Sequence, residues 1–347
     1  MLTGIESMGV ALIMVVGLFG AYGASFLNLP MGELFGATLV VIACLKATGK
    51  TIRLPGFVIL LVQIILGVSI GVTVKLNQLV AAFSPMLLFG LILCMLSQTI
   101  VSYLWLNKKE GWRPFESLLG AIPGALGAIL VLNEEQEKPS PKVIVSHTMR
   151  LLMLVVLAGY IASQGAEVIA EDIVFPVSWA LHLIAIGAMS FLLGKLTGYL
   201  GLPAPFMVMG LFVSLAYNNW LLGGAIAFVP KELIIFATSM LGVLIGVRLG
   251  ETTLREALRY SRAGLIITTM GIVITIGYAI LFSFITTKEW EVLLLAWLPG
   301  SVEAMTAVAI LIGLEPAFVA INHVMRLSLL YMLPSVCKTP LQQLSKR

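Results

Sequence analysis

Long apolar runs separated by short polar segments dominate this chain. Residues 76–107, 196–230 and 263–287 contain no Lys, Arg, Asp or Glu. Each run exceeds the ~20 apolar residues that an α-helix needs to cross the hydrocarbon core of a bilayer. The pattern predicts an all-α membrane protein with helices at 8–25, 31–47, 56–74, 80–106, 142–166, 176–198, 204–222, 232–248, 263–286 and 316–336.

Two further segments, 115–133 and 291–314, are each interrupted by a Pro-Gly step. Proline removes a backbone donor and clashes with the preceding turn, so it breaks a helix. Both segments are predicted to be broken inside the membrane. Each is either a re-entrant hairpin, which enters and leaves on one side, or a helix that crosses completely.

The two halves of the chain resemble each other. Around the Pro-Gly steps, three residue pairs are separated by the same 176 positions: Pro123 with Pro299, His147 with His323, and Arg150 with Arg326. Tandem duplication is a common ground plan of membrane transporters. We therefore expect a first membrane repeat at 1–168 and a second at 169–347, within a single integral membrane domain.

Composition agrees with a bilayer protein. The chain is 59% hydrophobic and 11% charged, whereas soluble domains carry about 25% charged residues. Residues 8–25 are interpreted as a retained helix, and Cys44, Cys94 and Cys337 lie too far apart to indicate a disulfide framework or a zinc site. We expect no metal, no cofactor and no nucleic-acid partner. The expected partners are lipid and a small molecule or ion, with a homodimer as one option.

The distribution of Lys and Arg decides between the two topologies. With re-entrant Pro-Gly segments and a cytoplasmic N-terminus, 16 basic residues lie on the cytoplasmic side and 3 on the far side. With both segments crossing, the split is 11 against 8. The positive-inside rule favours the first arrangement, with ten transmembrane helices and two re-entrant segments. Each half then crosses five times, so the second repeat is inverted relative to the first and both termini are cytoplasmic.

Arg150 and Arg326 are predicted to lie ~12–15 Å deep in a hydrocarbon core of about 30 Å. An arginine at that depth must face protein, water or a counter-charge. His147 and His323 each precede an arginine by three residues and therefore share its helical face. The arginines either form part of a binding site, cap carbonyl groups or pair with Glu303, and the histidines either join that site or are interhelical hydrogen-bonders.

Each Pro-Gly step also begins a new helix, whose N-terminal N–H groups can bind an anion. Glu303 occurs only in the second repeat, where it either couples transport to a proton or cation or forms a structural ion pair. The predicted substrate-binding residues are Pro123, Gly124, His147, Arg150, Pro299, Gly300, Ser301, Glu303, His323 and Arg326.

The doubled pattern of Pro-Gly, small residues, an apolar run and a polar residue before a buried Arg resembles the AbrB family of bacterial membrane proteins. The resemblance covers the whole chain and includes the runs Val302-Glu303-Ala304-Met305 and Val247-Arg248-Leu249-Gly250. The usual Pro-Gly-Gly is here Pro-Gly-Ala and Pro-Gly-Ser, and the usual Gln before the Arg is a His. The family is labelled both as a regulator of gene expression and as an ammonia monooxygenase. Its duplicated architecture is similar to that of inverted-repeat antiporters and anion transporters.

The expected function is secondary transport of a small solute, with an anion among the candidates, across the cell inner membrane. A membrane sensor that regulates gene expression indirectly is the alternative. An ammonia monooxygenase is less favoured, because His147, His182 and His323 lie far apart in sequence and such an enzyme needs a cluster of metal ligands.

Overall fold

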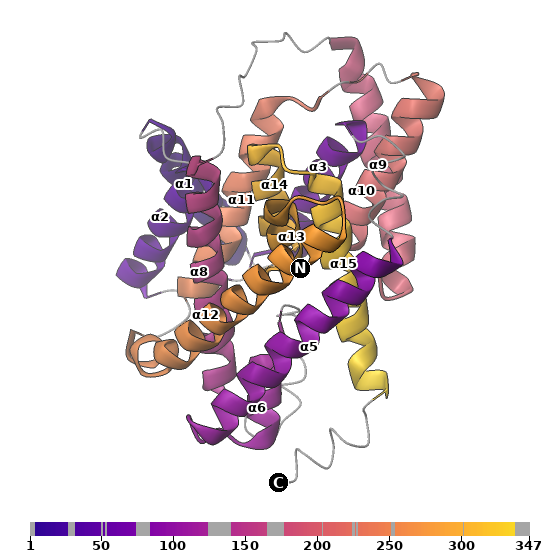
Figure 1. Ribbon diagram of the computed structural model, residues 1–347. Coiled ribbons are helices and arrows are strands. Elements are labelled where there is room, and N and C mark those ends of the chain that lie inside the picture. Colours follow the sequence, from indigo (N-terminus) through magenta and orange to yellow (C-terminus); the bar gives the residue numbers. More distant parts are fainter. Residues whose placement is uncertain are drawn as a thin grey trace. The chain divides into compact units, whose positions relative to one another are not determined.

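The computed structural model describes residues 4–26, 32–49, 51–52, 54–73, 84–123, 140–164, 177–202, 204–223, 226, 228–250, 254–300 and 302–336. Every regular element in these ranges is a helix (Figure 1). The elements are α1 (Gly4–Ser25), α2 (Gly32–Thr48), α3 (Gly56–Thr73), α5 (Pro85–Lys108), α6 (Pro114–Ala121), α8 (Pro141–Gln164), α9 (Val177–Tyr199), α10 (Pro205–Ala216), the π-helix η1 (Tyr217–Leu221), α11 (Lys231–Gly250), α12 (Leu254–Ile285), α13 (Trp290–Trp297), α14 (Val302–Ile312) and α15 (Pro316–Val336).

The predicted all-α fold is confirmed for this part of the chain. Three helical stretches in it are long and apolar enough to cross a membrane: Pro85–Lys108, Trp179–Tyr199 and Tyr260–Ile285. The break in the second Pro-Gly segment is also present, because α13 ends at Trp297 and α14 begins at Val302. In the first segment α6 ends at Ala121, and the predicted continuation over 124–133 lies outside the described residues.

The chain forms two compact units. Unit 1 comprises Met1–Leu79, Gly159–Glu251 and Thr306–Ala317, and unit 2 comprises Val80–Ala158, Thr252–Met305 and Phe318–Arg347. Each unit therefore takes helices from both predicted repeats. The repeat boundary at residue 168 describes the duplication in the sequence and stays a prediction.

Within unit 1, the packing pairs follow the sequence duplication. α1 packs on α2, and their counterparts α9 and α10 pack on each other. α2 packs on α11, and the counterparts α10 and α3 also form a pair. For each of these helix pairs, the equivalent pair of helices from the other repeat is also in contact. This is expected when two similar sequences fold into similar surfaces.

Glycines allow the closest of these approaches. A Cβ added to Gly67 on α3 would clash with the carbonyl of Met207 on α10, and one added to Gly242 on α11 would clash with the carbonyl of Leu34 on α2. The two glycines occupy equivalent positions in the repeats. Small residues in membrane helices let backbones approach each other, so packing accounts for this part of the duplication.

Unit 2 holds both Pro-Gly steps. α6 packs on α5, their repeat counterparts α13 and α12 pack on each other, and α5 and α12 also pack on each other. Residues 292–300, which include most of α13 and its break, are all buried. A hydrophobic cluster surrounds α6 and the adjoining helices, with Met95, Leu106, Trp112, Phe115, Leu119, Ile122, Val143, Ala263, Ile267 and Leu330 among its members.

Candidate functional site

The first Pro-Gly segment contains a short helix whose final carbonyl groups are bound by a side chain of α8. α6 ends at Ala121, and Ile122 and Pro123 follow as a buried break. Arg150 donates from Nη1 to the carbonyl of Ile122 and from Nη2 to the carbonyl of Gly120, each at 2.8 Å. The last carbonyl groups of a helix lack partners within that helix. Arg150 supplies donors to this end of α6.

The second Pro-Gly segment has the same construction, with α15 in the place of α8. After α13 ends, the Gly300 N–H donates to the Leu298 carbonyl at 2.8 Å and closes a tight turn around the buried Pro299. Arg326 donates from Nη1 to the Leu298 carbonyl and from Nη2 to the Gly300 carbonyl, the latter at 2.6 Å. One guanidinium thus holds carbonyl groups on both sides of the proline.

Each histidine binds a carbonyl group one turn earlier in the same short helix. His147 Nε2 lies 2.9 Å from the Leu119 carbonyl oxygen, and His323 Nε2 lies 3.0 Å from the Leu295 carbonyl oxygen. A backbone carbonyl only accepts hydrogen bonds, so Nε2 carries the proton in both rings. Both histidines therefore form hydrogen bonds between helices, which is one of the two roles expected from the sequence.

We refer to each His–Arg pair with the carbonyl groups that it binds as a bracket. Two of the three contacts agree between the two brackets: the histidine bond and the Nη1 bond each join residues 28 positions apart in both. The Nη2 bond differs. It reaches back 30 positions to Gly120 in the first bracket and 26 positions to Gly300 in the second.

Within the described part of the chain, the positive charge of the brackets is only partly compensated. Arg150 is 4% exposed and Arg326 is 1% exposed. Each faces the C-terminal end of a short helix, where the helix dipole places a partial negative charge. Among the described residues no carboxylate forms an ion pair with either arginine. The buried Nε groups of both arginines, and Nδ1 of His323, have no hydrogen-bond partner there.

The second bracket has a polar neighbourhood that the sequence did not single out. Gln98 on α5 donates to the Thr275 hydroxyl on α12 at 2.7 Å and to the Trp297 carbonyl at 3.4 Å. The Trp297 indole N–H donates to the Asn322 side-chain oxygen at 3.2 Å. Gln98 and Thr275 are polar residues within the charge-free runs 76–107 and 263–287. The sequence pattern did not distinguish them from other polar residues of membrane helices.

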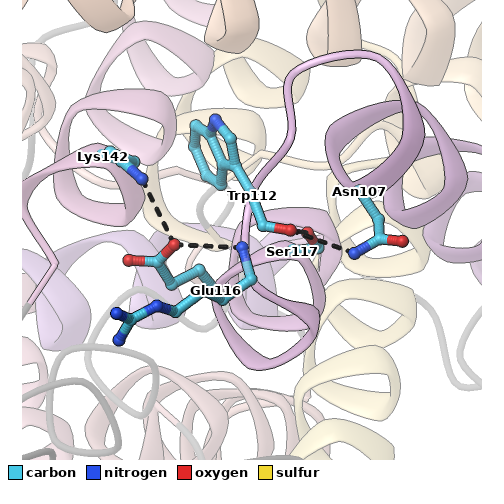
Figure 2. Close-up of polar contacts among 6 residues, drawn as sticks. Asn107, Trp112, Glu116, Ser117 and Lys142 are labelled. Carbon is cyan, nitrogen blue, oxygen red and sulfur yellow. Dashed lines mark hydrogen bonds and ion pairs between the residues drawn. The ribbon is translucent and has the colours of Figure 1, made fainter. Parts of the chain in front are cut away.

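The corner between α5 and α6 is fixed by polar contacts at the other end of the short helix (Figure 2). The Trp112 carbonyl accepts hydrogen bonds from the Asn107 amide at 3.0 Å and from the Ser117 hydroxyl at 3.3 Å. Lys142 on α8 forms an ion pair with Glu116 at 3.4 Å. α6 is thus bound to α8 at its first turn by Lys142 and at its last turn by the bracket.

Glu116 is ionised more readily than an ordinary glutamate. Burial by itself raises the pKa of this carboxyl group, but the Ser140 hydroxyl, the Lys142 ammonium and the Arg113 backbone N–H together hold the pKa below its usual value. The Arg113 backbone N–H donates to the same carboxylate at 3.3 Å, which binds Glu116 to the start of α6. The carboxylate therefore stabilises this corner while it is charged.

The structure locates most of the predicted site residues. It describes as buried the residues Pro123, His147, Arg150, Pro299, Gly300, His323 and Arg326. Gly124 and Ser301 lie outside the described residues. Glu303 belongs to the first turn of α14, and its side chain is outside the described part. The carbonyl-capping interpretation of the arginines is observed directly, and a binding role stays a prediction.

A comparison with known protein families assigns the chain to one of them. The model of the family described as transition state regulatory protein AbrB matches residues 34–339. The chain belongs to the AbrB family. The match includes both Pro-Gly steps and both brackets, so the membership predicted from these motifs is confirmed. No curated protein and no solved structure matched this AbrB family member.

Proposed function

We propose that this AbrB family member is a secondary transporter of a small solute in the cell inner membrane. The observation that supports the proposal most strongly is the doubled bracket. Two buried arginines and two histidines hold the ends of broken helices in a chain rich in apolar helices. A site that occurs once in each repeat fits a protein whose two halves move against each other around a central substrate.

The Pro-Gly step of the second segment interrupts a helix and leaves irregular backbone between α13 and α14. Irregular backbone at membrane depth is tolerated only where protein covers it or where it lines a water-filled cavity. Transporters use such broken helices because the free N–H and carbonyl groups at the break can bind a substrate or a coupling ion. The brackets bind carbonyl groups at each break. In the second break the N-terminal end of α14 follows, and the positive end of a helix dipole favours an anionic substrate.

The proposed topology has ten transmembrane helices, two re-entrant segments and inverted repeats. Its support is the charge split calculated from the sequence and the exchange of packing pairs between the repeats in unit 1. Single cysteines at Lys138 and Thr253, labelled from each side of the membrane, test it. Both positions should react from the cytoplasmic side. Labelling from opposite sides would eliminate the inverted arrangement.

Solute flux in proteoliposomes tests transport directly. We expect counterflow or proton-coupled uptake of at least one solute from a panel of small anions, amines and cations. Arg262→Gln serves as a control, because that arginine has 79% of its side chain exposed. The control should transport at the native rate. Absence of flux for the whole panel, from protein that is folded and correctly oriented, would argue against a transporter.

A membrane sensor that regulates gene expression indirectly is the second candidate. The observation in its favour is the description of the family as a transition state regulatory protein. In that case, a small molecule would bind at the brackets without being moved, and a cytoplasmic partner would respond. Flux-free binding, together with ligand-dependent association of a cytoplasmic partner, supports this candidate over transport.

We do not propose an enzyme. A metal-dependent monooxygenase requires several ligands that converge on one ion. His147 and His323 each direct a protonated Nε2 at a backbone carbonyl in separate brackets, which leaves only Nδ1 of each ring able to bind a metal. Oxidation of ammonia by purified, metal-supplemented protein would overturn this part of the proposal.

A further inference from the structure

An apolar groove lies between α5 and α12, two helices of unit 2 that pack on each other. The groove has a volume of about 430 Å³, and its lining is one residue of α5 and six of α12: Val101, Leu265, Ile266, Thr269, Met270, Val273 and Ile274. The one polar side chain among these seven, Thr269, donates its hydroxyl to the Leu265 carbonyl of its own helix at 2.9 Å. The lining therefore suits an apolar occupant.

The groove is long and follows the axis of α12. Its residues on that helix occupy three successive turns from Leu265 to Ile274, a length of ~14 Å at 1.5 Å per residue. They belong to the stretch Tyr260–Ile285, which is long and apolar enough to cross a membrane. Half of the hydrocarbon core of a bilayer is about 15 Å thick. The groove thus matches one leaflet in length, and the acyl chain of a phospholipid matches it in length and polarity.

The antiparallel arrangement of α5 and α12 determines which helix ends meet at the mouth of the groove. The hydroxyl groups of Ser97 and Tyr278 lie 2.8 Å apart, and Arg262 Nε lies 3.9 Å from Glu110 Oε1. Position numbers therefore rise along α5 as they fall along α12. Since Arg262 precedes Leu265 by one turn, the C-terminal end of α5 lies beside the Leu265 end of the groove.

Basic side chains gather at this end. Lys108 and Lys109 are both exposed, and neither forms an ion pair with a carboxylate in the part of the chain that the structure describes. Lys108 follows Val101 by seven positions and therefore shares its face of α5. Arg262 is already paired with Glu110. The two lysines thus carry positive charge that is not balanced at the mouth of the groove.

We propose that the groove binds one acyl chain of an anionic phospholipid, whose headgroup phosphate contacts Lys108 and Lys109. A groove with an apolar body and cations at one end is complementary to a molecule with an anionic head and an apolar tail. Basic sites beside membrane helices attract anionic lipids, above all in the cytoplasmic leaflet. Only the assignment to that leaflet rests on the proposed topology. The bound chain stabilises the contact between α5 and α12.

Lipid binding is measured on the full-length protein in a neutral detergent by native mass spectrometry, which counts bound lipids. Dioleoyl phosphatidylglycerol is compared with dioleoyl phosphatidylcholine, which has the same chains and no net charge. Dihexanoyl phosphatidylglycerol and glycerol phosphate test the need for long chains. We expect the first dioleoyl phosphatidylglycerol to bind at least about tenfold more tightly than either other lipid. Equal affinity for the two dioleoyl lipids, or displacement by glycerol phosphate, would overturn the proposal.

The lysines are tested by the double variant Lys108→Gln/Lys109→Gln. Both side chains are exposed, so the melting temperature of the lipid-free protein should not change. The preference for phosphatidylglycerol over phosphatidylcholine should fall below about twofold. Lys195→Gln is the matched control, because Lys195 is also exposed and lies near the end of another apolar stretch, Trp179–Tyr199. This control should keep the preference. A double variant that keeps it as well would refute the lysine contacts.

The groove itself is tested by Thr269→Trp, which adds bulk to its lining at an exposed position. The affinity for dioleoyl phosphatidylglycerol should fall to that for the dihexanoyl lipid. Unchanged affinity would show that the chain lies elsewhere. A second copy of the protein is the competing occupant: a dimer that binds no phosphatidylglycerol and that Thr269→Trp dissociates would replace the lipid by a protein interface. None of these measurements depends on flux, so their failure leaves the transporter proposal intact.

Discussion

The histidine of each bracket can be tested by two substitutions that differ in one property. His323 buries its ring completely and donates from Nε2 to the Leu295 carbonyl at 3.0 Å. Glutamine has a side-chain N–H₂ that can donate to the same carbonyl group, whereas leucine fills similar space without a donor. The comparison of His323→Gln with His323→Leu therefore isolates the hydrogen bond.

The expected magnitudes follow from the burial of the acceptor. In His323→Leu the Leu295 carbonyl would lose this donor where water does not reach it, which costs about 1–3 kcal/mol. In His323→Gln the bond is kept with altered geometry, and the expected cost is below about 1 kcal/mol. The leucine variant should therefore melt at a clearly lower temperature than the glutamine variant, which should lie near the wild type.

The assay is apparent melting temperature in one detergent at one scan rate, because unfolding of large proteins is often irreversible and only the order of variants is then comparable. The same pair of substitutions at His147 repeats the measurement independently, since its Nε2 contacts the Leu119 carbonyl in the same way. Equal destabilisation by glutamine and leucine would show that the ring itself, and not the donor, is required. A leucine variant as stable as the wild type would refute the reasoning altogether.

Four further outcomes are expected. Because the pKa of Glu116 is lowered in the folded state, its carboxylate contributes stability that is present at neutral pH and lost as the pH falls through the folded pKa. Glu116→Gln should therefore melt below the wild type at pH ~7, and this difference should shrink as the pH falls below the ordinary carboxyl pKa of about 4. Gly71→Ala should lower the melting temperature by an overpacking cost of about 1–3 kcal/mol, because the added methyl group would clash with the Leu211 carbonyl. Gly187→Ala, where a Cβ meets no neighbouring atom, should be neutral or stabilising in the same scan. Gln98→Leu should cost about 1–2 kcal/mol in unfolding titrations, since it leaves a buried carbonyl and hydroxyl without their donor.

Apolar periodicity and proline positions predicted much of this fold. The helices that contain charge-free runs are present, and α13 ends where Pro299 requires it. Several boundaries differ from expectation. α1 begins at Gly4 and not at 8, and the predicted helix at 204–222 ends in the π-helix η1. The largest difference is in α12, which begins at Leu254, whereas the predicted helix began at 263. The charged residues before 263 are compatible with helix and end only the apolar run. Hydropathy therefore located the membrane portion of this helix and missed its polar extension.

The partners of the buried arginines could not be predicted in the same way. Depth alone required that Arg150 and Arg326 contact protein, water or a counter-charge, and three interpretations satisfied that requirement equally. The carbonyl groups that they bind lie 26 to 30 positions earlier in the chain, so only tertiary packing brings them together. The Gln98 network depends on packing between α5 and α12 and has no pattern of its own in the sequence.

The two brackets differ in the residues around them, and because the repeats are otherwise similar, this difference can be used to interpret substitutions. The position of Trp297 is taken by Ala121 in the first repeat, and the position of Asn322 is taken by Ser146, whose hydroxyl binds the Val143 carbonyl of its own helix. The second break therefore carries an additional bond between α13 and α15 that the first lacks. An effect of substitution that appears at both brackets belongs to the chemistry of arginine, histidine and carbonyl groups. An effect confined to the second bracket belongs to the network around Trp297.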